Sequence, residues 1–158
     1  MSSAYKFYNP DGIFFVSTSV VFWMDVFVRR IYKEIFTESL IHCIQHKGLV
    51  VHAWVLMPSH FHLIISRNGE DELEAIMRDF KKFTSTQITE AIKNNVQESR
   101  RELMMNAFKK AGAANANNKI YPRLTSRAGI LAARQSSHSI EYKQNEGPAI
   151  ELHSLQPS

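Results

Sequence analysis

Apolar residues along this chain follow two different periods, and each period predicts a different kind of element. Residues 13–21 combine β-branched and aromatic residues with Ser and Thr in alternation, which is typical of a strand in the middle of a sheet. Leu49 to Leu56 and Phe61 to Ser66 have the composition of two further strands, and the turn Met57-Pro58-Ser59 joins them.

Three other segments carry apolar residues at three- and four-residue spacing, which predicts amphipathic helices. The first extends from Asp25, a candidate N-cap, to Lys47, with Gly48 as its stop signal. The second follows a cap at Glu70 or Asp71, and the third covers residues 98–111 and ends at Gly112. The expected buried positions are Phe27, Ile31, Ile35, Leu40, Ile41 and Ile44 in the first helix, Leu73, Ile76, Met77, Phe80, Phe83, Ile88, Ala91 and Ile92 in the second, and Leu103, Met104, Ala107 and Phe108 in the third.

The order strand, helix, strand, strand, helix, helix predicts an α+β fold, with helices packed against an antiparallel sheet. At 158 residues the chain is long enough for one domain with an apolar core of its own. Its character changes near Tyr121, because residues 122–158 are rich in Ser, Gln and Arg and contain few apolar residues. We therefore expect a domain over residues 1–121 and a loosely held tail over residues 122–158.

Two histidines open the second strand of the predicted pair. Because strand side chains alternate between faces, His60 and His62 project from one side of the sheet and Phe61 from the other. Neutral imidazoles are the commonest protein ligands for divalent metals, so the pair is a candidate metal site that needs a third ligand from elsewhere. The alternative for an isolated His-x-His is ordinary strand alternation, with the rings covering a sheet face.

Composition and charge narrow the classes of function. The single cysteine, Cys43, excludes an internal disulfide and a cysteine-rich zinc module, and it fits a cytoplasmic protein. The longest apolar run, residues 13–28, is interrupted by polar residues, and the chain opens without a secretory leader pattern, so we expect no membrane association. A net charge of +4 permits a polyanionic partner without requiring one. The basic residues cluster at Arg29-Arg30, Arg78 with Lys81-Lys82, Arg100-Arg101 and Lys109-Lys110.

The residues around the histidine pair resemble a known signature. The run Trp54-x-Leu56-Met57-Pro58-x-His60-Phe61-His62-Leu63-Ile64 is similar to that of the HUH-type tyrosine transposases, in particular the REP-associated branch that acts on single-stranded DNA hairpins. Residues 5–17 and 76–85 are similar to the same branch, in the expected order and spacing. The resemblance extends from about residue 5 to Tyr121.

This resemblance implies a ferredoxin-like sheet with the two histidines on a central strand, and a homodimer. It implies that His60 and His62 hold magnesium or manganese, although imidazole ligands by themselves suit manganese or another transition ion better. It also implies attack by a tyrosine hydroxyl on single-stranded DNA, with a phosphotyrosine intermediate. The helix with Arg78, Lys81 and Lys82 would contact phosphates, with Thr84 or Ser85 on its flanks, whereas the competing interpretation is an ordinary solvated helix face.

The C-terminal part of the chain does not match the family. Family members carry their tyrosine on a helix after the segment similar to residues 118–121, where Tyr121 matches a non-catalytic position. Tyr142 is the remaining candidate nucleophile, and Glu146 stands where the family has an amide as its third metal ligand. We therefore expect a transposase whose strand cleavage is impaired. The alternatives are a non-catalytic DNA-binding remnant of a transposase and a metal hydrolase that uses the two histidines with a carboxylate.

Overall fold

The computed structural model describes residues 7, 9, 11–114, 131–132 and 138–139. Its strands form one sheet in the order β2-β3-β1-β4, and β5 also pairs with β1. All these pairings are antiparallel, and β1 lies inside the sheet as predicted. The strands are β1 (Phe14–Val20), β2 (Leu49–Leu56), β3 (His60–Arg67), β4 (Leu131–Ala132) and β5 (His138–Ser139).

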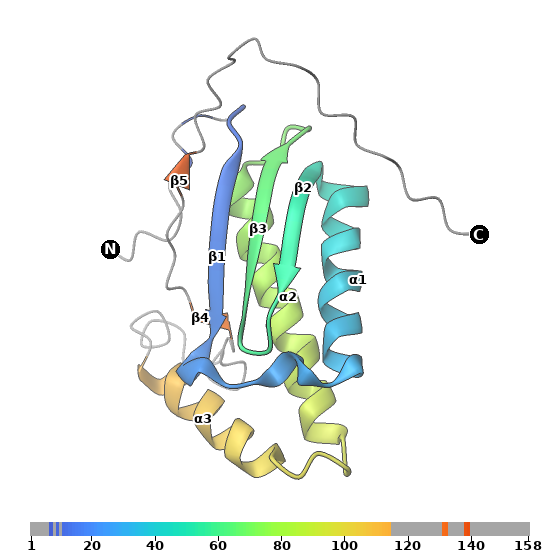
Figure 1. Ribbon diagram of the computed structural model, residues 1–158, viewed down its shortest axis with the longest axis vertical. Coiled ribbons are helices and arrows are strands. Elements are labelled where there is room, and N and C mark those ends of the chain that lie inside the picture. The colour runs from blue at the N-terminus through green and yellow to red at the C-terminus, as the bar shows by residue number, and fades with distance from the viewer. Residues whose placement is uncertain (1–6, 8, 10, 115–130, 133–137, 140–158) are drawn as a thin grey trace, which may run out of the picture.

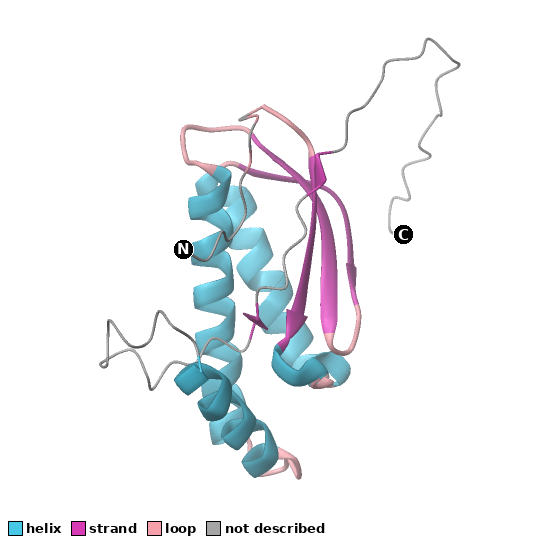
Figure 2. Ribbon diagram, turned by 90° about the vertical axis from the view of Figure 1, so that its left-hand side faces the viewer, coloured by secondary structure: helices cyan, strands magenta, loops and turns pink. Residues whose placement is uncertain are grey.

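The helices are α1 (Arg30–Lys47), α2 (Leu73–Asn94) and α3 (Arg101–Ala114), and two short turns, η1 (Val21–Trp23) and η2 (Val26–Val28), precede α1. The helices α1 and α2 pack on one face of the sheet, and α3 lies below the end of β1 (Figures 1 and 2). Helix α3 aside, the chain order β1-α1-β2-β3-α2-β4 with the spatial order 4-1-3-2 is the ferredoxin-like arrangement. The predicted α+β fold is confirmed.

Strand β3 shows why the two faces of the sheet differ. Phe61, Leu63 and Ile65 have no exposed surface, while the residues between them are only half-buried. The Phe61 ring lies 4.9 Å from that of Phe36 on α1 and 6.0 Å from that of Phe80 on α2, measured between centroids. The core therefore fills the space between the sheet and the two helices, and no described helix covers the opposite face, which we call the open face (Figure 2).

The predicted start of the first helix was wrong. Helix α1 begins at Arg30, and Asp25 caps no helix with its side chain. The preceding segment folds into η1 and η2 because the backbone at Phe22 and Trp23 has positive φ angles, which an α-helix excludes. Gly48 does end the helix in the left-handed conformation, with its N–H donating to the Cys43 carbonyl.

The apolar stripes of the helices were predicted only in part. On α1 the buried face is aromatic, through Tyr32 and Phe36. Of the isoleucines that we expected there, Ile35 packs against the core and the others are exposed. On α2, Thr84 and Ser85 are buried instead of flanking, while Phe83 is 54% exposed. Both helices carry apolar residues on more than one side, so spacing alone could not identify the side that meets the sheet. The expected core residues that are exposed are Ile31, Ile41, Ile44, Phe83 and Leu103.

Helix α3 also differs at its ends, because it begins at Arg101 and continues through Gly112 to Ala114. Cys43 is buried and forms no disulfide. No helix in the described part of the chain is both long and apolar enough to cross a bilayer. The tail prediction for residues 122–158 lies outside the described residues, apart from β4 and β5.

Candidate metal and nucleic-acid site

The two histidines of the motif lie together on the open face. His60 and His62 belong to β3, and their ring centroids are 5.1 Å apart. Their cross-strand neighbours on β1 are Ser19 and Ser17. The pair is thus held by a central strand, hydrogen-bonded on both sides, which fixes the two rings relative to each other.

Neighbouring side chains orient each imidazole. The Phe15 ring stacks on His62 with centroids 5.3 Å apart, and the Trp23 ring meets His60 edge to face at 5.4 Å. The Ser59 hydroxyl lies 3.3 Å from Nδ1 of His60. With Nδ1 engaged in this way, Nε2 is the nitrogen of His60 that remains for a ligand.

His62 is held in the form that binds metals. Its Nδ1 is buried and has no hydrogen-bond partner among the described residues. Burial, and then the charge of the nearby His60, lower the pKa of His62. Both effects favour the neutral imidazole, which is the ligand form. A divalent metal therefore fits His60 and His62 as two of its donors.

A complete metal site is not present in the described part of the chain. No group of three His, Cys, Asp or Glu side chains gathers there in a way that could hold an ion. A further ligand would come from other residues, from water or from a phosphate oxygen. Tyr142, the predicted nucleophile, lies outside the described residues, as do Tyr121 and Glu146.

A turn of two aromatic residues stands beside the histidines. Phe22 and Trp23 have φ angles of 54° and 55°, and the Met24 N–H lies 3.3 Å from the Val21 carbonyl. Turns with two positive φ angles are normally made by Gly, Asn and Asp, and each aromatic residue here costs about 1–3 kcal/mol. The sequence carried no turn signal at this point, so the turn was missed.

The turn of the histidine motif holds this strained segment on both sides. The Val20 N–H donates to the Ser59 carbonyl at 2.7 Å, and the Phe27 N–H donates to the Pro58 carbonyl at 2.8 Å. The strained turn leaves Phe22 61% exposed and Trp23 58% exposed. Exposed aromatic rings at such a position are suited to stacking on unpaired bases.

The three basic residues predicted on α2 are not brought to the histidines. Helix α2 packs through Phe80 on the opposite face of the sheet from the imidazoles. The Arg78 guanidinium lies 3.2 Å from Asp79, and burial lowers the pKa of Lys81 to about 8. Lys82 is exposed. The structure therefore places the predicted phosphate contacts and the predicted metal ligands on two sides of the molecule.

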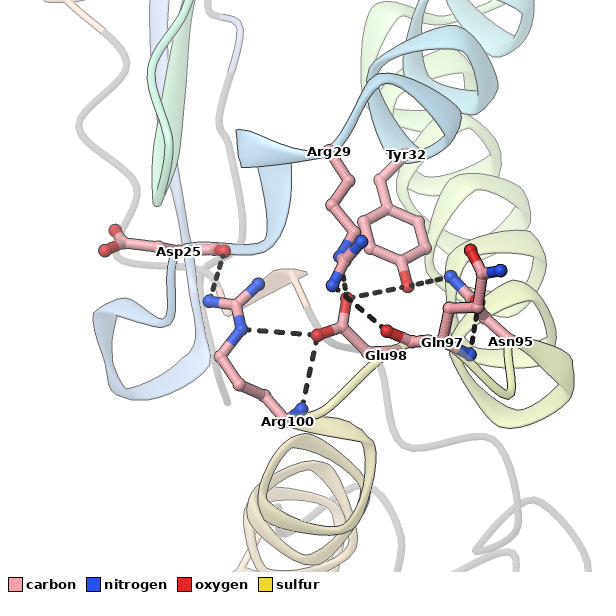
Figure 3. A network of polar contacts seen from close by, with 7 residues as sticks. All are labelled: Asp25, Arg29, Tyr32, Asn95, Gln97, Glu98 and Arg100. Atoms are coloured by element: carbon pink, nitrogen blue, oxygen red, sulfur yellow. Dashed lines mark hydrogen bonds and ion pairs between the residues drawn. The ribbon is translucent and has the colours of Figure 1, made fainter.

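Two arginines from the other basic clusters form ion pairs within the protein. The carboxylate of Glu98 has no exposed surface and pairs with Arg29 at 2.6 Å and with Arg100 at 3.3 Å (Figure 3). The Tyr32 hydroxyl donates to the same carboxylate at 3.2 Å. Sequence reasoning missed this network because Glu98 is separated from Arg29 and Tyr32 by more than sixty residues.

Comparisons with known proteins identify a family and similar solved structures. The family model described as "Transposase IS200 like" matches residues 23–121. The fold is similar to the structure of a REP-associated tyrosine transposase bound to a REP hairpin, with a TM-score of 0.50 and 18% sequence identity over 90% of this chain and 64% of that chain. A candidate transposase from Deinococcus radiodurans R1 gives a TM-score of 0.45 and 14% identity over 67% of this chain and 95% of that chain.

No curated protein matches the chain. The chain spans 64% of the length of the hairpin-bound transposase. The matched residues 23–121 cover more than half of the 158 residues and include the histidine motif and helices α1, α2 and α3. The chain belongs to the IS200-like transposase family.

Proposed function

We propose that this chain binds single-stranded or hairpin DNA and holds a divalent metal, magnesium or manganese, at His60 and His62. The observation that carries the proposal is the pair of imidazoles on the open face, one of them with a buried and unpartnered Nδ1. Two imidazoles fixed on a central strand are prepared ligands, and the exposed rings of Phe22 and Trp23 beside them suit unpaired bases.

The residues of this chain would position the DNA phosphate. A divalent metal, when bound, polarises a phosphate and orients it for in-line attack. Phe15 fixes the plane of the His62 ring, and Ser59 and Trp23 fix that of His60, so neither imidazole would need to reorganise. Imidazole donors favour manganese over magnesium, which prefers oxygen ligands.

The proposed reaction is a transesterification. A tyrosine oxygen forms a bond to phosphorus while the bond from phosphorus to the 3′ oxygen breaks, and the phenolic proton balances the new 3′-hydroxyl. Among the described residues Tyr32 is the only tyrosine, and its buried hydroxyl is bound to Glu98. We therefore propose Tyr142 as the nucleophile. We propose weak cleavage, because its surrounding sequence contains few residues that could hold it rigidly.

A covalent adduct tests this proposal. The chain is incubated with a fluorescent single-stranded hairpin oligonucleotide and manganese, and adducts are sought on a denaturing gel. The expected result is a faint manganese-dependent adduct that Tyr142→Phe removes and Tyr121→Phe retains. Hairpin binding without any adduct would favour the second candidate, a non-catalytic DNA-binding protein of the transposase family. No binding at all would contradict both.

We also propose that the chain acts as a cytoplasmic homodimer. Strand β2 lies at the end of the sheet, with no strand on its outer side among the described residues, and Trp54 and Val55 on it are about half exposed. An open apolar edge of this kind pairs readily with a second sheet. Sedimentation over a range of concentrations tests this part, and a monomer throughout would contradict it.

A further inference from the structure

A pocket of about 420 Å³ lies between η1 and α3, away from the core. Its walls are largely apolar, and Asn106 and Lys110 contribute the polar side chains. The lining residues are Phe22, Met24, Leu103, Asn106, Ala107 and Lys110. Phe22 and Leu103 on its walls are each more than 60% exposed, so the hollow is open to solvent.

The pocket is joined to the histidine pair through two consecutive residues. Trp23 meets the His60 ring at 5.4 Å, and its neighbour Phe22 lines the pocket. Their Cα atoms are separated by one peptide unit, about 3.8 Å. The pocket and the proposed phosphate site therefore lie on two sides of the same strained turn.

The strain itself indicates a use for the Phe22 ring. Glycine would adopt the φ of 54° at this position without steric cost, and the exposed ring gains little from burial. The hydrogen bonds from Val20 and Phe27 to the Ser59 and Pro58 carbonyls hold the turn in place. The chain thus maintains an unfavourable conformation that presents an aromatic face to the pocket.

We propose that this pocket takes one unstacked nucleobase of the DNA strand whose phosphate lies at His60 and His62, so the inference rests on the proposed function. The base stacks on Phe22 and contacts Leu103. The Asn106 amide, with its donors and acceptor, reaches the base edge, and the Lys110 ammonium binds a flanking phosphate.

Size and charge both fit this occupant. A volume of about 420 Å³ lies at the lower end of the range for small-ligand pockets, which runs from about 300 to 1,000 Å³. Helix α3 carries Lys109 and Lys110 exposed at this end, so the rim is positively charged. An apolar pocket with a cationic rim is complementary to a nucleotide, which combines a flat base with a negative phosphate.

Two fluorescent single strands of about twelve units test the proposal by anisotropy, one of thymidines and one of abasic sites with the same phosphate backbone. The wild-type full chain is expected to bind the thymidine strand about tenfold more tightly. Phe22→Gly removes the ring, and Ala107→Trp fills the pocket. Both variants should lose most of the preference for the thymidine strand, with the remainder due to stacking on Trp23, and their affinity for the abasic strand should not change.

Control variants distinguish the loss of the pocket from a damaged fold and from a general loss of DNA binding. Val96→Ala, which shortens an exposed apolar side chain outside the pocket, should keep the tenfold preference. Phe22→Gly should also unfold at a higher temperature, because it relieves the turn, so its weaker binding cannot be due to a damaged fold. Equal binding of the two strands by the wild type would overturn the pocket and leave the proposed function standing. Binding of neither strand would overturn both.

Discussion

Oε2 of Glu98 lies 2.6 Å from Nε of Arg29, in a network that also includes Tyr32 and Arg100. Arg29 directly precedes α1, and Glu98 lies in the loop between α2 and α3. The Arg100 guanidinium also donates to the Asp25 carbonyl at 3.1 Å (Figure 3). One carboxylate thus ties the loop before α3 to the segment that follows the strained turn.

Replacing this carboxylate should destabilise the protein. Glu98→Gln leaves two guanidinium groups without their counter-charge, and removal of one partner from a buried ion pair is costly. Because both arginines are about one-third exposed, water compensates part of the loss, and we expect about 2 kcal/mol in urea unfolding at pH 7. Glu102→Gln, at an exposed position four residues away, should cost less than about 0.5 kcal/mol.

The stabilities of the wild type and of Glu98→Gln should become equal in acid. Burial by itself raises the pKa of Glu98, but hydrogen bonds from Arg100 and Tyr32 and the charges of Arg100 and Arg29 together lower it. The unfolded chain therefore takes up this proton first. The stabilisation by ionised Glu98 is complete above its ordinary pKa of 4.5. It is lost as the pH falls through the lower pKa that Glu98 has in the folded protein. A constant difference between wild type and Glu98→Gln down to pH 3 would contradict this assignment.

Gly48 should not tolerate a side chain. Its φ is 68°, and a Cβ atom added there would lie 2.6 Å from the Asn68 carbonyl oxygen. That carbonyl belongs to the residue whose N–H bonds Gly48 at 2.7 Å, so it has little freedom to move. We expect Gly48→Ala to cost about 2 kcal/mol by thermal or urea unfolding. Gly69→Ala, where the nearest atom would be 3.5 Å away, is the matched control and should be almost neutral.

Manganese should stabilise the protein through the histidine pair. A ligand that binds only the folded state at a hundred times its Kd adds about 2.7 kcal/mol, which is readily seen as a higher Tm. His60→Ala and His62→Ala should each remove this shift, as should a chelator. His52→Ala is the control, because His52 is exposed and bonds Ser66 at 2.8 Å instead of joining the pair. A manganese-induced rise in Tm that persists in the variant with both His60→Ala and His62→Ala would contradict the metal assignment.

The basic residues of α2 should contribute to DNA binding through their charge. If Lys81 and Lys82 each contact a phosphate of a single strand, each adds about 0.7 to the slope of log affinity against log salt. Lys81 loses its proton near pH 8, so its share should disappear between pH 7 and pH 9 while that of Lys82 remains. Lys81→Gln should abolish the pH dependence of the slope. Slopes unaffected by Lys81→Gln and by Lys82→Gln would mean that this surface is only a solvated helix face.

The strands β1, β2 and β3 were predictable because alternation and turn residues are local signals, whereas β4 and β5 lie in a segment where we expected a loosely held tail. The strand pair around Met57-Pro58-Ser59 and the stop at Gly48 appeared where the pattern placed them. The buried side of α1 was not predictable, since Phe36 and Ile41 are equally apolar and only the position of α2 and the sheet decides which is covered.

The candidate site could likewise be predicted only as far as local patterns reach. Strand alternation was sufficient to place His60 and His62 on one face. The rings that orient them come from Phe15 and Trp23, about forty residues earlier, and no local pattern connects these positions. Arg29 and Arg100 counted as free positive charges in the sequence, yet the fold uses both to neutralise Glu98.

The placement of α2 behind the sheet sets a minimum length for DNA that touches both proposed surfaces. A strand that contacts His60 and also Lys82 has to travel around an edge of the sheet and past one helix layer. The two layers together are about 20 Å thick, so the strand has to span at least about this distance. Oligonucleotides too short to span this distance reach either the histidines or the lysines, but not both. The length of DNA that the protein protects therefore measures the path around it.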